Sequence, residues 1–376
     1  MIKRIMPDRK TLWMLLLVAV SGPVSYLSLP PEPVPYLAFL LPVILAAVAH
    51  STVRSLKQSL VAGLLLGLVA SVVGFHWMFE AMTQFAPVPL WAAGIEFLFF
   101  VFLSFWKYPL VIISFTVLLR LPVRLSRSLG FALIATLAEL ITPHLFEWHW
   151  GLLIASENRL AQLASVAGVS GLTFVQFFIG YHLYRLTRFL PFLKNRRIIG
   201  RVFARIPLLR MSAPFLLVVI CLYIGARLEE RAVLAEHAAA RANVALLQTN
   251  TPPAPFIPGY TFTADQLQNL FYRDIPMLLQ ELDLVAMGEH LDLIVMPESA
   301  VPYYSTERNE FTESEGDVIY ASVFQSLVES IATRYGAPLL FNEDVRGPSA
   351  IANYSLYNAA TLITADGSRG QSYYKR

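Results

Sequence analysis

The sequence predicts a multi-span α-helical membrane bundle followed by an α/β domain. Hydrophobic residues make up 56% of the 376 residues and charged residues only 15%, whereas a soluble domain carries roughly 25% charge. Near residue 242 the apolar residues also change from long uninterrupted segments to short runs between helix-like periods. We therefore expect a membrane part at 1–226, about seven helices in all, a helical connector at 227–241 and an α/β domain at 242–376.

Seven apolar segments are the candidate spans. Most of them approach the roughly 20 residues that a helix needs to cross a bilayer. The second and fifth are short by this measure, and the second contains Pro35 and Pro42. The segments are 11–29, 34–49, 58–79, 90–119, 128–143, 160–186 and 212–226.

The basic residues predict how these segments cross the membrane. Lys and Arg collect at the N-terminus and in every second connection, and are almost absent from the connections between. This is the positive-inside pattern with the N-terminus in the cytoplasm. Seven crossings then place everything after residue 226 outside the cytoplasm, facing the periplasm of a bacterium. Because the net charge of +3 comes from these connections, it does not indicate a nucleic-acid partner.

Three polar features of the membrane part have a plain structural interpretation. His144, Glu147 and His149 in HLFEWHWG lack the i, i+4 spacing of a helical zinc motif, so we expect aromatic anchoring at the interface and no metal. Glu139 lies within the fifth segment, where a carboxylate is costly, and it is expected to be paired. Cys221 lies in LLVVICLYIG, where the thiolate is disfavoured, so it is not expected to be a nucleophile.

Short apolar runs in the C-terminal part predict strands, and the longer periodic segments between them predict helices. Strand, helix, strand, helix, strand in this order implies a parallel sheet with right-handed crossovers. Asp366-Gly367 predicts a hairpin that adds antiparallel strands. The expected strands are 243–248, 291–296, 338–341, 356–364 and 371–375, and the expected helices are 263–289 and 318–335.

The stretch LDLIVMPESAVP contains the first candidate for chemistry. Its apolar run is a buried strand that Pro297 ends, because proline has no N–H to donate to the ladder. Glu298 follows at the carboxyl edge of the sheet, where α/β folds usually place ligands. A proline and a glutamate also suit the first turn of a helix, so the motif alone leaves both interpretations open.

Two motifs together, PESAVP and YNAATLITADG followed by YYKR, on a chain with several preceding spans, resemble the apolipoprotein N-acyltransferase family. That resemblance implies a membrane bundle joined to a nitrilase-like (carbon–nitrogen hydrolase) α/β sandwich domain, incomplete in this chain. It places Glu298 as the general base and Lys375 as the lysine of a Glu-Lys-Cys triad. No cofactor is implied. The implied acyl donor is a membrane phospholipid, and the implied acceptor is the N-terminal amine of a diacylglyceryl-modified lipoprotein.

The third member of the triad is not found after Lys375, where the family carries its cysteine and a further span. We therefore expect the chain to be a C-terminally truncated member, a fragment or a degenerate paralogue, inactive as given. FNED at 341–344 also departs from the glycine-containing stretch usual in the family. Two other functions stay open: an inactive membrane paralogue that binds lipid or lipoprotein, and a membrane-anchored amidase of the nitrilase superfamily.

Overall fold

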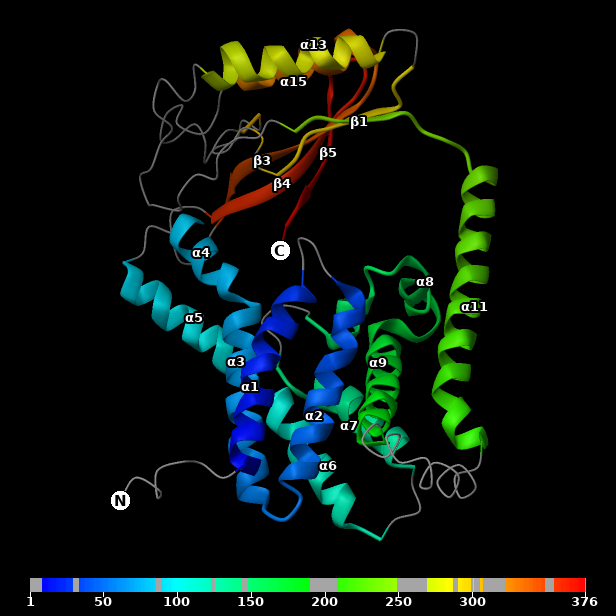
Figure 1. Cartoon of the computed structure of the whole chain (residues 1–376). Coiled ribbons are helices and arrows are strands. Elements are labelled where there is room, and N and C mark those ends of the chain that lie inside the picture. Colours follow the sequence, from blue (N-terminus) through cyan, green and yellow to red (C-terminus); the bar gives the residue numbers. More distant parts are fainter. Residues whose placement is uncertain are drawn as a thin grey trace. The chain divides into compact units, whose positions relative to one another are not determined.

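A computed structural model shows two compact units (Figure 1). The helical unit comprises Met1–Thr83 and Val88–Ala238, and the sheet unit includes Ala239–Arg376. Each is described by itself. The structure describes residues 9–29, 34–85, 89–122, 126–143, 148–189, 208–248, 269–286, 290–298, 300, 305–306, 322–348 and 355–375.

Helices account for nearly all of the described helical unit, and at least one falls within each of the seven predicted apolar segments. They are α1 (Arg9–Leu27), η2 (Pro35–Phe39), α2 (Leu40–Ser51), α3 (Leu56–Gly74), α4 (His76–Phe85), α5 (Leu90–Ser104), α6 (Lys107–Arg120), α7 (Arg127–Ile141), η3 (Trp150–Ile154), α8 (Asn158–Ala161), α9 (Ala164–Phe189) and α11 (Leu208–Ala238). Among the described residues, η2 and η3 are short 3-10 helices and the other elements of this unit are α-helices.

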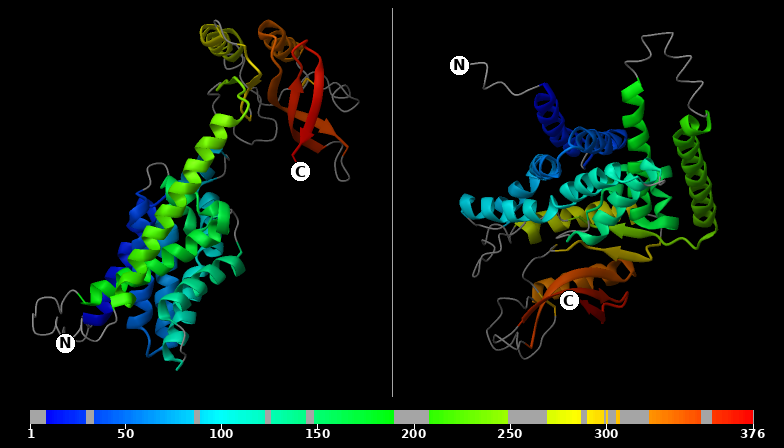
Figure 2. Two further views of the ribbon diagram at one scale, coloured as in Figure 1. Left: turned by 90° about the vertical axis from the view of Figure 1, so that its right-hand side faces the viewer. Right: turned by 90° about the horizontal axis from the view of Figure 1, so that it is seen from below.

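Several predicted segments are interrupted. The segment 90–119 divides into α5 and α6, because Pro109 has no N–H for a continuous helix and its ring would meet the carbonyl of Phe105. The segment 58–79 divides after Gly74, and α9 contains a non-helical residue at Gly168 (φ 64°). In contrast, α11 continues unbroken past residue 226 to Ala238 (Figure 2).

Among the described residues, three helical stretches are long and apolar enough to cross a membrane: Leu56–Gly74, Leu90–Arg120 and Ala164–Arg188. Thr11–Leu27 and Pro35–Ser51 are shorter apolar helices. The multi-span bundle is therefore supported in part, and the number of crossings stays a prediction.

Helix α2 lies at the centre of the helical unit, because it packs against α1, α3, α6 and α9 and most of its residues are buried (Figure 1). Helices α3 and α6 approach closely because glycines face the second helix. A Cβ at Gly63 would lie 2.6 Å from Cα of Pro109, and one at Gly67 would lie 2.9 Å from the carbonyl oxygen of Phe105. Small residues at helix contacts are typical of packing within lipid.

The sheet unit is built on one five-stranded sheet with the order β1-β2-β3-β4-β5. The first three strands are parallel, and β4 and β5 continue the sheet antiparallel, as predicted. Gly367, at φ 85°, lies in the turn between β4 and β5. The strands are β1 (Val244–Leu246), β2 (Leu293–Val295), β3 (Leu339–Gly347), β4 (Ser355–Ile363) and β5 (Arg369–Tyr374).

Two helices lie together on one side of this sheet, α13 (Ile275–Ala286) and α15 (Ser322–Tyr335) (Figure 1). A π-helical turn, η5 (Leu270–Asp274), precedes α13. Their apolar residues form one buried cluster with residues of the strands. The predicted starts of these helices, at 263 and 318, lie outside the described residues. Strand β3 runs to Gly347, six residues beyond the predicted 341.

Candidate active site

Glu298 lies just beyond the carboxyl end of β2. The strand is held between β1 and β3, with Leu247 N donating to Val295 O and Met296 N donating to Leu340 O. Pro297 then ends the ladder, and Ala300 N donates back to Pro297 O at 3.3 Å to close a turn. The carboxylate of Glu298 is therefore presented from a turn at the sheet edge, and 61% of its side chain is exposed.

Lys375 follows directly after β5 and is held by its backbone. Its N–H donates to the carbonyl oxygen of Asn358 at 2.8 Å, which continues the β4–β5 pairing by one residue. From this position Nζ lies 3.5 Å from Oε1 of Glu298. The two residues that the sequence singled out, 77 positions apart, thus meet at one edge of the sheet.

A side-chain amide that sequence reasoning missed also contacts this carboxylate. Asn358 on β4 donates from Nδ2 to Oε1 of Glu298 at 2.9 Å. Asn342 on β3 donates from Nδ2 to Oδ1 of Asn358, also at 2.9 Å. Because that bond uses the Asn358 carbonyl as acceptor, it turns the amide N–H₂ of Asn358 toward Glu298. The asparagine of the YNAATLIT motif is the sequence feature that could have indicated this contact.

The geometry suits proton transfer. Oε1 of Glu298 accepts from both Asn358 and Lys375, and a carboxylate that is oriented in this way and open to solvent has the position that a general base requires. An exposed ion pair contributes at most about 1 kcal/mol to stability. This ion pair is therefore expected to contribute little to the stability of the fold. A lysine beside a carboxylate is also a group that can stabilise an oxyanion.

A second carboxylate in the sheet unit, Glu343 on β3, is completely buried. It accepts hydrogen bonds from Thr306 and Thr361 and pairs with Arg369 on β5. Glu343 belongs to the FNED stretch, which sequence reasoning recorded only as a departure from the family. No sequence signal marked its partners, which lie 37, 18 and 26 residues away.

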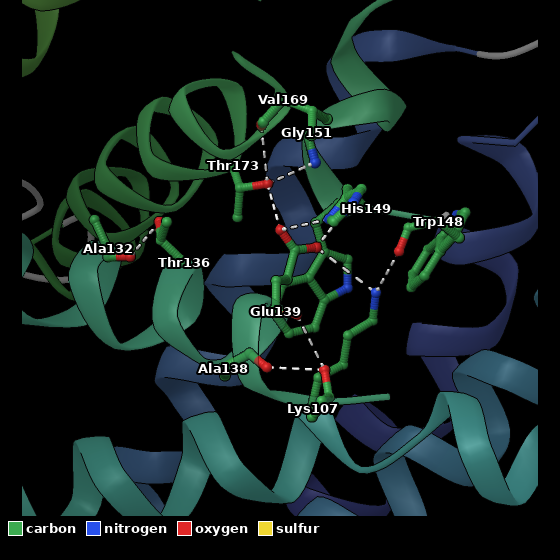
Figure 3. A network of polar contacts seen from close by, with 12 residues as sticks. Lys107, Ala132, Thr136, Ala138, Glu139, Trp148, His149, Gly151, Val169 and Thr173 are labelled. Carbon is green, nitrogen blue, oxygen red and sulfur yellow. Dashed lines mark hydrogen bonds and ion pairs between the residues drawn. The ribbon is translucent and has the colours of Figure 1, made fainter. Parts of the chain in front are cut away.

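Glu139 is the corresponding buried carboxylate of the helical unit, and it is paired as expected (Figure 3). Its Oε1 lies 3.6 Å from Nζ of Lys107, and Oε2 accepts from the hydroxyl of Thr173 at 2.6 Å. The backbone N–H of Trp150 also donates to Oε1. These contacts hold the η3 segment against α6, α7 and α9.

Lys107 completes this network from α6. Its Nζ lies 3.2 Å from the centroid of the Trp148 ring and 4.6 Å from that of Trp150. It also donates to the carbonyl oxygen of Trp148 at 3.4 Å. The ammonium is therefore enclosed by a carboxylate, a carbonyl and two aromatic faces, all of which stabilise a buried cation.

The remaining candidates have limited chemistry. Cys221 is buried in α11 of the helical unit. His149 contacts Glu139 at 3.8 Å, whereas His144 and Glu147 lie outside the described residues. Within the described parts of the chain, no group of three or more His, Cys, Asp and Glu side chains is arranged to hold a metal ion.

Comparison with known proteins finds similarity in both units. A family model described as the apolipoprotein N-acyltransferase N-terminal domain matches residues 21–181. A second, described as carbon-nitrogen hydrolase, matches residues 237–376. The second match contains Glu298, Asn358 and Lys375.

Two curated relatives match 98% and 74% of the chain. Apolipoprotein N-acyltransferase 2 of Leptospira interrogans serogroup Icterohaemorrhagiae serovar copenhageni is 29% identical over 374 residues, which is 98% of this chain and 61% of the relative. Apolipoprotein N-acyltransferase 1 of the same species, serovar Lai, is 26% identical over 286 residues, covering 74% and 46%. The chain thus spans less than two thirds of the length of these relatives.

Proposed function

We propose a function from the premise that the chain belongs to the apolipoprotein N-acyltransferase family, to which both of its units are similar. The protein transfers a fatty acyl chain from a membrane phospholipid to the N-terminal amine of a diacylglyceryl-modified lipoprotein. The observation that carries this proposal is the contact of Lys375 and Asn358 with the carboxylate of Glu298. The apolar helices support a membrane location, because both substrates are anchored in lipid.

The reaction divides into two acyl transfers. A cysteine thiolate, formed when Glu298 takes the thiol proton, attacks the ester carbonyl of the phospholipid. The ester C–O bond breaks, and the lysophospholipid leaves with the proton from Glu298. The amine of the acceptor then attacks the thioester and loses a proton to Glu298, and the C–S bond breaks. In both steps Lys375 stabilises the oxyanion.

Residues 1–376 do not supply this thiolate in the sheet unit, since their one cysteine is Cys221 in α11. We therefore expect residues 1–376 alone to give no transfer. The protein expressed from its whole reading frame is the material for the assay. We place it in the bacterial inner membrane with the sheet unit facing the periplasm, where lipoprotein N-termini are exposed.

Glu298→Gln tests the proposal. The amide has the shape of the carboxylate but cannot take a proton, so acyl transfer should fall about 10²- to 10⁴-fold. The assay uses full-length protein in phospholipid vesicles with a synthetic diacylated lipopeptide, and mass spectrometry detects the added chain. The control is Glu281→Gln, the same change at an exposed position of α13.

Two results would contradict the proposal. Hydrolysis of small amides without lipid-to-amine transfer indicates an amidase. Lipopeptide binding with no turnover in the wild-type protein indicates a non-catalytic paralogue.

A further inference from the structure

We propose that Glu343 is a positioning residue that holds Glu298 and Lys375 together by binding the two segments that carry them. The inference rests on the proposed function, because it assigns Glu343 to that same site. Glu343 acts through Thr306 on one side and Arg369 on the other. Its side chain is fully buried on β3.

One oxygen of Glu343 binds the segment that follows Glu298. Oε2 accepts from the backbone N–H of Thr306 at 2.6 Å and from its hydroxyl at 2.8 Å. The hydroxyl of Ser305 lies at 3.4 Å from the same oxygen. Thr306 is eight residues after Glu298, so its attachment to β3 holds the chain at a point close in sequence to Glu298.

The other oxygen binds the strand that leads to Lys375. Oε1 accepts from Nη2 of Arg369 and from the hydroxyl of Thr361, each at 2.6 Å. Arg369 is six residues before Lys375, at the start of β5. It also donates to the hydroxyls of Thr306 and Ser372. Arg369 thus ties β5 both to β3 and to the segment after Glu298.

A shorter series of hydrogen bonds also connects β3 to the same site. Asn342, the neighbour of Glu343, orients Asn358, and Asn358 donates to Glu298. Fixing β3 against β5 therefore fixes Asn358 between Glu298 and Lys375. The site is formed by three segments, which are the turn after β2, strand β4 and the end of β5. Hydrogen bonds connect all three to the buried carboxylate of Glu343.

Stability alone is a weak reason for this arrangement. Burying a charge costs free energy that an ion pair often only just offsets, and apolar residues of similar volume are commonly as stable. The network requires a carboxylate, because both oxygens of Glu343 accept hydrogen bonds and neither donates one. An amide at this position must turn its N–H₂ toward donors on one side or the other, so Glu343→Gln breaks one of the two attachments.

Zero-length cross-linking measures the proposed effect without relying on activity. A carbodiimide joins a carboxylate to an amine only when the two groups touch, and it should form a Glu298–Lys375 isopeptide bond in the wild-type protein. Glu343→Gln should lower its yield several-fold, measured by mass spectrometry of the digested full-length protein below its unfolding temperature. Arg369→Lys keeps the positive charge but loses the branched contacts of the guanidinium group. Its cross-linking yield should lie between those of the wild type and Glu343→Gln.

Two controls separate positioning from general destabilisation. Glu281→Gln makes the same change on the surface of α13. Tyr335→Phe weakens the α13–α15 contact in the same unit, away from the site. Both should keep the wild-type cross-linking yield. Equal losses in Tyr335→Phe and Glu343→Gln would show a merely structural role and overturn the inference.

Kinetics supply the second measurement. In the acyl-transfer assay, Glu343→Gln should lower kcat about tenfold to a hundredfold, the scale of a misplaced reacting group, with KM nearly unchanged. Unchanged cross-linking and kcat in Glu343→Gln would reject the inference while leaving the proposed function standing. A reduced cross-link in a protein that shows no acyl transfer would reject the proposed function and leave the positioning role of Glu343 standing.

Discussion

The three carboxylates Glu139, Glu298 and Glu343 have different environments and therefore different uses. Glu298 is mostly exposed and contacts a lysine and an amide, so it is open to substrate. Glu343 and Glu139 have fully buried side chains, each with a cation and several hydrogen-bond donors. A buried carboxylate without such partners would be too costly to keep ionised. Burial therefore separates the proposed catalytic glutamate from the two that hold segments in place.

The pair of Lys107 and Glu139 predicts non-additive effects of mutation. Lys107→Met leaves the carboxylate without its cation and should destabilise the helical unit by about 3–5 kcal/mol. Glu139→Gln should also destabilise it, because Lys107 then loses its counter-charge. The double variant should cost about 1–3 kcal/mol less than the sum of the two single variants.

The measurement is an equilibrium titration with denaturing detergent in mixed micelles. Thr136→Ala is the control, since the Thr136 hydroxyl bonds only to the preceding turn of its own helix at Ala132 O (Figure 3), and it should change stability by less than about 0.5 kcal/mol. Simple additivity of the two single variants would show that the pair is not energetically coupled.

At the scale of elements, the contact between α13 and α15 predicts a loss of stability at alkaline pH. Tyr335 donates to Asp283 Oδ1 at 2.7 Å and to Leu279 O at 3.1 Å. Burial, followed by the hydrogen bond and charge of Asp283, raises the pKa of Tyr335 from 10.0 to about 12. The unfolded chain therefore releases this proton first, so the contribution is complete below pH 10 and is lost as the pH rises toward 12.

Tyr335→Phe should remove this pH dependence. The variant is expected to be less stable than the wild type at neutral pH and to approach it between pH 10 and 12, because only the wild type loses the contact there. Urea titrations monitored by fluorescence at a series of pH values measure the difference. A constant difference across that range would contradict the assignment.

The sequence predicted local elements better than the contacts between them. The hairpin at Asp366-Gly367 follows from a residue pair with a known turn preference, and the parallel sheet follows from the alternation of strands and helices. The break between α5 and α6 was missed, although Pro109 indicated it, because the apolar run continues through it. The partners of Glu343 could not be found, since residues far apart along the chain carry no shared periodicity.

The candidate site shows the same limit. Glu298 was found from its place after a predicted strand, and Lys375 from a motif that resembles the family's. Asn358 was overlooked because its motif was interpreted as a strand and as part of that resemblance, and no role was considered for its side chain. Its contact with Glu298 depends on the antiparallel register that places Asn358 opposite Asp344, and single-sequence patterns predict such registers poorly.

At the scale of the whole molecule, the distribution of charge predicts that the ends of the helical unit lie on opposite sides of a membrane. Arg54 and Lys57 lie around the start of α3, and Arg120 and Arg127 are the last residue of α6 and the first of α7. They belong to the basic connections that the positive-inside pattern places in the cytoplasm. An odd number of crossings before Ala238 then places the sheet unit in the periplasm. The number of crossings itself decides the side on which the proposed chemistry occurs.

Single cysteines test this orientation in intact cells. Cys221→Ser first removes the chain's own thiol, which is buried. Ser326→Cys, exposed on α15, should then react with a membrane-impermeant maleimide once the outer membrane is permeabilised. Lys57→Cys, exposed at the start of α3, should react only after the inner membrane is disrupted. Labelling of Ser326→Cys only after the inner membrane is disrupted would place Glu298 and Lys375 on the cytoplasmic side and exclude acylation of exported lipoproteins.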